Sequence, residues 1–139
     1  MKTLTLTKVK SGSKFETLAS YSRAVAIGDW IFVSNTAGID YVTRTLPETA
    51  AEQLRLAIGT VERALDAVDA TLADVVRIQV FVPDDVDVTE VTEVLGEVFQ
   101  GIDPALTMTR SPLAGEYKAE IEVTAFRGVG AKEGERIDL

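Results

Sequence analysis

The hydrophobic pattern is strongest between residues 45 and 83, where it predicts one helix followed by one strand. The apolar positions of the helix are spaced four, three, four and three residues apart, and they are Leu54, Ile58, Val61, Leu65 and Val68. This spacing places them on one helical face, while Glu52 and Glu62 fall on the opposite, solvated side. Pro47 and the acidic residue after it suit a helix start, so the helix is expected to run from near Pro47 to near Asp69.

The strand that follows is predicted over residues 75–82, a β-branched run that only Arg77 and Gln79 interrupt. Valine and isoleucine pack well on a pleated surface, so this run is expected to be largely buried. Pro83 ends it, because proline has no N–H to donate to a neighbouring strand. The helix must bury an apolar stripe and the strand must be covered, so the two are expected to pack together.

Weaker patterns on either side complete the element order. Alternating Leu and Thr predict a first strand over residues 4–9, and a turn at residues 28–29 joins strand-like runs at 22–26 and 30–33. Residues 14–20 are mixed in character and predict a loop. A second helix is expected around residues 91–99, and strands at 105–111 and 117–126. The apolar stripe of this second helix is Val91, Val94, Leu95, Val98 and Phe99.

The predicted fold class is α+β, with a mixed β-sheet and two helices on one of its faces, in the order β-β-β-α-β-α-β-β. A single domain is expected over residues 1–127. Residues 128–139 are rich in glycine and charge, and they predict a frayed C-terminal tail.

Composition narrows the classes of function. The chain has 139 residues and a net charge of -8, which argues against a nucleic-acid partner because phosphates require a basic surface. It has no cysteine and no histidine, which removes thiol nucleophiles, the usual neutral-pH base and the commonest metal ligand. No apolar run reaches the roughly 20 residues of a membrane span. We therefore expect a cytoplasmic protein without a membrane partner and without a metal site built on histidine or cysteine.

Three groups of polar residues are candidates for chemistry. Glu120 and Glu122 lie two apart in a predicted strand and so share a face, where one carboxyl of raised pKa could serve as an acid or base, or both could simply be solvated. The set Ser34, Asn35, Thr36 and Gly38 could donate to an anion or carbonyl, or form a turn. The acidic residues at 84, 85 and 87 could cap the next helix or bind a metal, and a cap is the simpler interpretation.

In order along the chain, several segments resemble the reactive intermediate deaminase (Rid) superfamily, also called YjgF-like. The segments are YSRAV at 21–25, GDWIFVS at 28–34, EQL at 52–54, ADVV at 73–76, VFV at 80–82, PA at 104–105 and EIEV at 120–123. None is diagnostic alone, but the ordered set covers residues 20–126. The resemblance implies a chorismate-mutase-like sheet backed by two helices, a homotrimer and ligand clefts between subunits.

The resemblance also implies a reaction. Members of its best-known branch hydrolyse enamines and imines such as 2-aminoacrylate to ketoacids and ammonia without a metal or cofactor. By position, Tyr21 resembles the tyrosine of the cleft and Glu120 the glutamate that positions water. Residues near the cleft would include Ser34, Asn35, Ala105, Leu106 and Thr107.

The chain departs from that branch at two positions. Leu106 stands where the branch has an arginine that binds the substrate carboxylate, and a leucine side chain cannot replace those paired, charged hydrogen bonds. Asn35 replaces the glycine that usually follows the Val-Ser pair. Arg110 is the nearest other cation, but in a regular strand it would lie about 13 Å from Leu106, and a structural role at a subunit contact is expected for it.

Two hypotheses follow from this departure. In the first, the chain is a divergent Rid homotrimer that hydrolyses an imine-like or non-carboxylate small molecule, with Glu120 moving the proton and poor use of 2-aminoacrylate. In the second, the same trimer is a non-catalytic module that binds or responds to a small organic ligand.

Overall fold

A computed structural model describes residues 3–139, so residues 1–2 of the predicted domain lie outside the described part. Its centre is one six-stranded sheet with the strand order β1-β2-β3-β6-β4-β5. The strands are β1 (Leu6–Val9), β2 (Ala24–Ile27), β3 (Trp30–Ala37), β4 (Val75–Val82), β5 (Ala105–Arg110) and β6 (Glu120–Phe126). All neighbours are antiparallel except β4 and β5, so the sheet is mixed as predicted.

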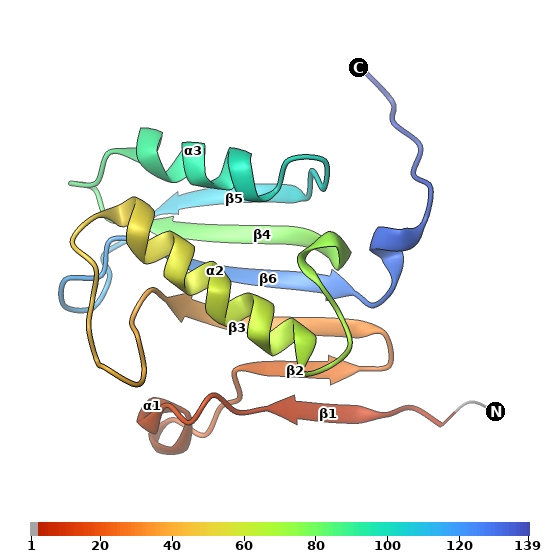
Figure 1. Cartoon of the computed structure of the whole chain (residues 1–139), viewed down its shortest axis with the longest axis horizontal. Coiled ribbons are helices and arrows are strands. Elements are labelled where there is room, and N and C mark those ends of the chain that lie inside the picture. The colour runs from red at the N-terminus through yellow and green to blue at the C-terminus, as the bar shows by residue number, and fades with distance from the viewer. Residues whose placement is uncertain (1–2) are drawn as a thin grey trace.

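Two helices, α2 (Ala50–Asp66) and α3 (Val88–Val98), lie side by side on one face of this sheet (Figure 1). The predicted stripe of α2 is buried against it, with Leu54, Val61 and Leu65 wholly inaccessible to solvent. Burying side chains of this size contributes about 2 kcal/mol each, so the pairing of α2 with the sheet stabilises the fold substantially. None of the helices within residues 3–139 is both long and apolar enough to span a bilayer.

Helix α2 begins at Ala50, three residues after Pro47, where the sequence predicts its start. Thr49 is its N-cap: the Thr49 hydroxyl accepts from the Glu52 backbone N–H at 3.1 Å and donates to the Glu52 carboxylate at 3.1 Å. The first of these bonds satisfies a free backbone N–H of the first turn, so Thr49 sets the start of the helix beyond Pro47. The acidic turn after β4 also caps a helix as predicted, because the Asp87 carboxylate accepts from the Thr89 backbone N–H at 2.9 Å.

Two predictions about local structure are wrong. The sequence predicts a loop over residues 14–20, but Lys14–Leu18 form a short helix, α1, that Ser13 caps. Phe15 and Leu18 of α1 are exposed while Glu16 is buried, so no apolar stripe marks this helix in the sequence. The strand expected over residues 30–33 continues to Ala37, so the segment Ser34–Gly38, for which a turn is one of the two alternatives, is a strand for most of its length.

Two 3₁₀ turns join the C-terminal segment to the sheet. The turn η1 (Leu72–Asp74) precedes β4, and η2 (Val129–Ala131) packs against it. The Gly130 backbone N–H donates to the Asp74 carboxylate at 2.9 Å, and a Cβ on Gly130 would lie 2.6 Å from Ala73. The first part of the predicted tail is therefore attached, and residues 132–139 contain neither helix nor strand.

Helices α2 and α3 leave the other face of the sheet uncovered (Figure 1), and we call it the open face. Large apolar side chains stand on it around the hairpin of β2 and β3: Leu6, Ile27, Trp30, Phe32 and Phe126. Leu6 is 56 % exposed and Phe32 is 49 % exposed. The ring of Trp30 packs edge-on against Phe126, with 5.0 Å between the ring centroids. A single chain therefore leaves a band of apolar surface in solvent.

Candidate functional site

The predicted acid–base residue, Glu120, is the first residue of β6 and stands on the open face. Asn35 of β3 donates from its Nδ2 to the Glu120 Oε2, with 2.6 Å between these atoms. Burial raises the pKa of the Glu120 carboxyl above its usual range, and the hydrogen bond from Asn35 opposes part of this rise. No Lys or Arg within residues 3–139 forms an ion pair with Glu120. The carboxyl is therefore held by a neutral donor, which leaves it able to gain or lose a proton closer to neutral pH.

A β-bulge in β3 puts Asn35 on the same face as Glu120. Val33 pairs with Val123, and Thr36 pairs with Ile121, so two residues of β3 lie opposite the single residue Glu122. This extra residue shifts the inward–outward alternation by one position. Thr36 is consequently wholly buried, and Asn35 is exposed on the open face.

A hollow of about 560 Å³ lies beside this pair of residues. It is lined by the loops that follow β3 and precede β6, by the start of α1, by the end of β3 and by the start of β6. Its aromatic lining residues are Phe15, Tyr21, Tyr41 and Tyr117, and its charged ones are Arg23, Arg44, Glu116 and Glu120. The hollow is thus large enough for a small organic molecule, and it offers several aromatic side chains and one carboxyl of raised pKa.

Tyr41 is another group of the hollow whose acidity is altered. Burial raises the pKa of the Tyr41 hydroxyl, the nearby Arg23 guanidinium lowers it, and Tyr21 and Tyr117 add to the rise. The Tyr41 hydroxyl therefore stays protonated at neutral pH and is available as a hydrogen-bond donor to a ligand.

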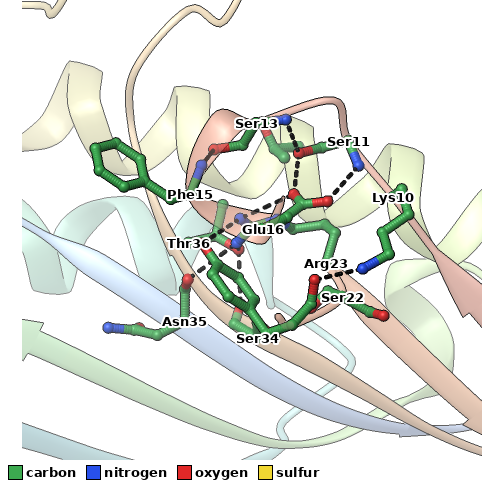
Figure 2. A network of polar contacts seen from close by, with 12 residues as sticks. Lys10, Ser11, Ser13, Phe15, Glu16, Ser22, Arg23, Ser34, Asn35 and Thr36 are labelled. Carbon is green, nitrogen blue, oxygen red and sulfur yellow. Dashed lines mark hydrogen bonds and ion pairs between the residues drawn. The ribbon is translucent and has the colours of Figure 1, made fainter. Parts of the chain in front are cut away.

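A buried ion pair lies behind the hollow. The Arg23 Nη2 is 3.3 Å from the Glu16 Oε2, and both side chains are 3 % exposed. Figure 2 shows Glu16 reaching from α1 towards Arg23 while its carboxylate accepts from Ser11. The Arg23 Nη2 also donates to the Tyr21 hydroxyl at 3.4 Å, and its side chain lies 5.6 Å from the Tyr21 ring centroid. The pair thus joins α1 to the wall of the hollow that Tyr21 forms.

The structure brings together some of the predicted site residues. Tyr21, Asn35 and Glu120 line the same hollow. Ser34 does not line it, because the Ser34 hydroxyl donates to the Ser22 carbonyl at 2.7 Å. Glu122 shares the open face with Glu120 as predicted, but it is not among the residues of the hollow.

The predicted binding residues of β5 lie elsewhere in the chain. Ala105, Leu106 and Thr107 are on the edge strand and do not line the hollow of their own chain. Leu106 is 50 % exposed, and the Thr107 hydroxyl accepts from Arg77 at 3.1 Å. Arg110 is also absent from the hollow, and its Nη1 donates to the carbonyl oxygens of Pro83 and Val86 at 2.5 and 2.7 Å. Arg110 therefore holds the loop between β4 and α3 of its own chain.

Sequence reasoning missed Glu16, Tyr41 and Tyr117 and gave Arg23 no role. Arg23 lies in the YSRAV segment that carries part of the family resemblance. A charged side chain is normally expected at the surface, so nothing in the sequence indicates that Arg23 is buried. The tyrosines lie in loops without periodicity. Within residues 3–139, no cluster of three or more acidic side chains suited to a metal ion is present.

Comparisons with known proteins agree on one family. A family model described as Endoribonuclease L-PSP matches residues 11–127. A RutC family protein of Pyrococcus abyssi is 30 % identical over 112 residues, which are 79 % of this chain and 88 % of that protein. The RutC family protein UK114 of Drosophila melanogaster is 29 % identical over 130 residues, covering 92 % of this chain and 94 % of the relative.

A solved structure shows the same fold. The crystal structure of Rv2704 from Mycobacterium tuberculosis, described as a member of the YjgF/YER057c/UK114 family, superposes with a TM-score of 0.77. It is 37 % identical in sequence, and the match covers 88 % of this chain and 99 % of that one.

Proposed function

Because this chain belongs to the Rid/YjgF superfamily, we propose that it is a cofactor-independent hydrolase of imine-like small molecules that works as a homotrimer. The observation that carries the proposal is the Glu120 carboxyl. It is half-buried beside an aromatic hollow, its pKa is raised by burial, and its hydrogen-bond partner is the neutral Asn35.

The proposed reaction needs little more than such a carboxyl. Water adds to the carbon of a C=N bond while one of its protons moves to the nitrogen. The proton of the new hydroxyl group then moves to the nitrogen as well, and the C–N bond breaks to give a carbonyl compound and ammonia. An enamine first becomes an imine by gaining a proton on carbon and losing one from nitrogen. Glu120 would accept the proton of water and return it to the nitrogen, and a pKa near the working pH favours both transfers. The Tyr21 and Tyr41 hydroxyls would orient the substrate.

Leu106 indicates which substrates to expect. In the best-known branch of the superfamily an arginine at this position binds the substrate carboxylate, and leucine offers no such contact. Arg110 cannot replace it within the chain, because its guanidinium is engaged with the loop between β4 and α3. We therefore propose a substrate that is more apolar than 2-aminoacrylate and does not depend on a carboxylate anchor at this position.

The open face supports the proposed trimer. The band that contains Leu6, Ile27, Trp30 and Phe32 is apolar and without cover in a single chain. Association through this face would remove it from water, and each 100 Å² of apolar surface so buried would contribute about 2.5 kcal/mol before the cost of association. Leu106 and its neighbours, on the edge strand, would then complete the hollow of an adjacent subunit.

The alternative is a non-catalytic trimer that binds or responds to a small organic ligand in the same hollow. The loss of the arginine at position 106 is the observation that favours it. The two proposals differ over Glu120, which is needed for turnover but not for ligand binding.

The description of the family model names an endoribonuclease, but we do not propose RNA as the substrate. The chain has 22 acidic against 14 basic residues and a net charge of -8, so it would repel a phosphate backbone, and it has no histidine to act as a general base.

The test is ammonia release from freshly generated imines that carry apolar side chains, compared between the parent and Glu120→Gln. We expect turnover by the parent and a loss of at least about 100-fold in the variant, as is usual when a general acid–base group is removed. Equal rates in the two proteins would exclude the proposed catalysis. Retained biological function in Glu120→Gln, together with its loss when Ala37→Trp fills the hollow, would favour the binding module.

A further inference from the structure

The β-bulge that turns Asn35 towards Glu120 has unusual hydrogen bonds on its other side. The Arg23 Nη1 donates to the Asn35 carbonyl oxygen at 3.0 Å and to the Thr36 Oγ1 at 3.1 Å (Figure 2). One guanidinium nitrogen therefore contacts the backbone of the residue whose side chain holds Glu120. These contacts come from a residue 12 positions earlier in the chain.

The backbone groups of a β-bulge need hydrogen-bond partners from outside the ladder. Its extra residue breaks the ladder, so backbone groups at Ser34 and Asn35 cannot all pair with β6. Other bonds compensate: the Ser34 backbone N–H donates to the Arg23 carbonyl at 2.9 Å, and the Thr36 hydroxyl donates to the Ser34 carbonyl at 2.7 Å. The Arg23 guanidinium donates to the Asn35 carbonyl, so this backbone acceptor of the bulge has its hydrogen bond from the side of β2.

Arg23 can do this only if its charge is balanced. Its side chain is 3 % exposed, and an unpaired charge at such a depth would be strongly unfavourable. Glu16 supplies the balancing carboxylate through the Arg23 Nη2, while Ser11 donates to Glu16 from both its backbone N–H and its hydroxyl. Glu16 of helix α1 is thus the counter-ion that allows the buried Arg23 guanidinium to contact the bulge.

We infer that Arg23 and Glu16 are positioning residues for Glu120: they hold the β3 bulge in the form that directs the Asn35 side chain onto the Glu120 carboxylate. This inference rests on the proposed role of Glu120, and it extends the site to two buried residues that form no hydrogen bond or ion pair with Glu120. The competing explanation is that the ion pair only stabilises the fold and leaves the acidity of Glu120 unaffected.

The test is the pKa of the Glu120 side-chain carboxyl, followed by carbon-detected NMR titration of the full chain without substrate. Other titratable and charged groups around Glu120 must be assigned in the same spectra: Tyr21, Tyr41, Tyr117, Arg23, Arg44, Glu116 and Glu122. Asn35→Ala removes the hydrogen bond directly, so the Glu120 pKa should rise, because that bond lowers it in the parent.

The decisive variant is Glu16→Gln combined with Arg23→Met, which removes both buried charges together and leaves neither unpaired. We expect the Glu120 pKa to rise as far as in Asn35→Ala, and to rise no further when Asn35→Ala is added. Arg55→Gln is the matched control. Arg55 of α2 and Glu97 of α3 form an exposed ion pair on the helices, which cover the face of the sheet opposite to Glu120, so this variant should leave the Glu120 pKa unchanged.

An unchanged Glu120 pKa in a folded double variant would overturn the inference, as would a shift that simply adds to that of Asn35→Ala. If the double variant does not fold, Arg23→Lys takes its place. Its single ammonium keeps the charge opposite Glu16 but cannot also reach the bulge, so a rise in the same direction is expected and no change would refute it. Because the titration needs no turnover, a failed activity assay would count against the proposed function alone.

Discussion

Gly38 lies directly against the backbone of Gln53: a Cβ atom on Gly38 would be 1.9 Å from the Gln53 carbonyl oxygen. Gln53 is 1 % exposed, and its side chain donates to the Pro47 carbonyl at 2.8 Å and accepts from the Lys118 backbone N–H at 2.8 Å. The contact therefore joins the end of β3 to α2 and to the loop that leads into Glu120.

Gly38→Ala should for this reason be strongly destabilising. The added methyl group would force β3 and α2 apart, and we expect a loss of about 3 kcal/mol in the free energy of unfolding. The control is Gly96→Ala, because Gly96 is on the exposed side of α3 and a methyl group added there would have nothing within 4 Å. That variant should gain about 0.5–1 kcal/mol. Urea denaturation measures both, and similar stabilities would contradict the close approach.

Glu120 should give the protein a distinct dependence of stability on pH. A carboxyl whose pKa is raised in the folded state binds its proton more tightly there than in the unfolded chain. Its stabilising contribution is then complete below the unfolded pKa of about 4.5 and is lost as the pH rises through the folded pKa.

Glu120→Gln, which mimics the neutral carboxyl, should therefore become progressively more stable than the parent as the pH rises from about 4 to about 7. Denaturation at a series of pH values would measure the difference. A parent that gains stability relative to the variant over this range would show that the folded pKa is lowered rather than raised.

Leu106→Arg should restore use of 2-aminoacrylate. A guanidinium at this position could form two charged hydrogen bonds with the substrate carboxylate, and a gain of about tenfold or more in turnover is expected. Leu106→Met keeps an apolar side chain of similar volume and should show no gain. If the parent already releases ammonia from 2-aminoacrylate as fast as Leu106→Arg, the role assigned to this position is wrong.

Trp30→Glu should dissociate the proposed trimer. Trp30 is 45 % exposed in a single chain and lies within the apolar band, where a charge would be costly once the face is buried. Val42→Glu is the control, because Val42 is 92 % exposed on a loop away from the sheet face. Light scattering after gel filtration should give a trimer for the parent and the control, and a monomer for Trp30→Glu. A monomeric parent at micromolar concentration would refute the assembly.

Arg110→Ala should affect stability without affecting the hollow. The variant loses the donors to Pro83 and Val86, and a cost of about 1 kcal/mol is expected for these partly exposed bonds. Arg136→Ala removes an exposed pair with Asp138 and should change nothing measurable. A change in substrate preference in Arg110→Ala would instead place Arg110 in the ligand site.

Most of the fold could be predicted from periodicity. The stripe of α2 and the strand β4 were predicted closely because each buries a regular face, and regular burial leaves a regular pattern. Helix α1 was missed because its buried residue, Glu16, is charged while Phe15 is exposed. The extension of β3 beyond Val33 was missed because a bulge interrupts the alternation by which a strand is recognised.

The site was less accessible to prediction. Resemblance to a known family indicated Glu120 and Tyr21, and the structure places both at one hollow. The contact of Glu120 with Asn35, 85 residues away, depends on strand register and on the bulge, and neither can be read from local sequence. Arg23 is buried because Glu16, from a different element, balances its charge, so its burial cannot be predicted from either residue alone.

The bulge also bears on how this site could be lost in evolution. Deleting the Asn35 codon would give β3 a regular ladder with β6 and leave the core largely as it is. The same event would take away the amide that now meets Glu120 and leave the Arg23 guanidinium without its carbonyl acceptor. Descendants with the same scaffold but a different activity could thus arise in one genetic step.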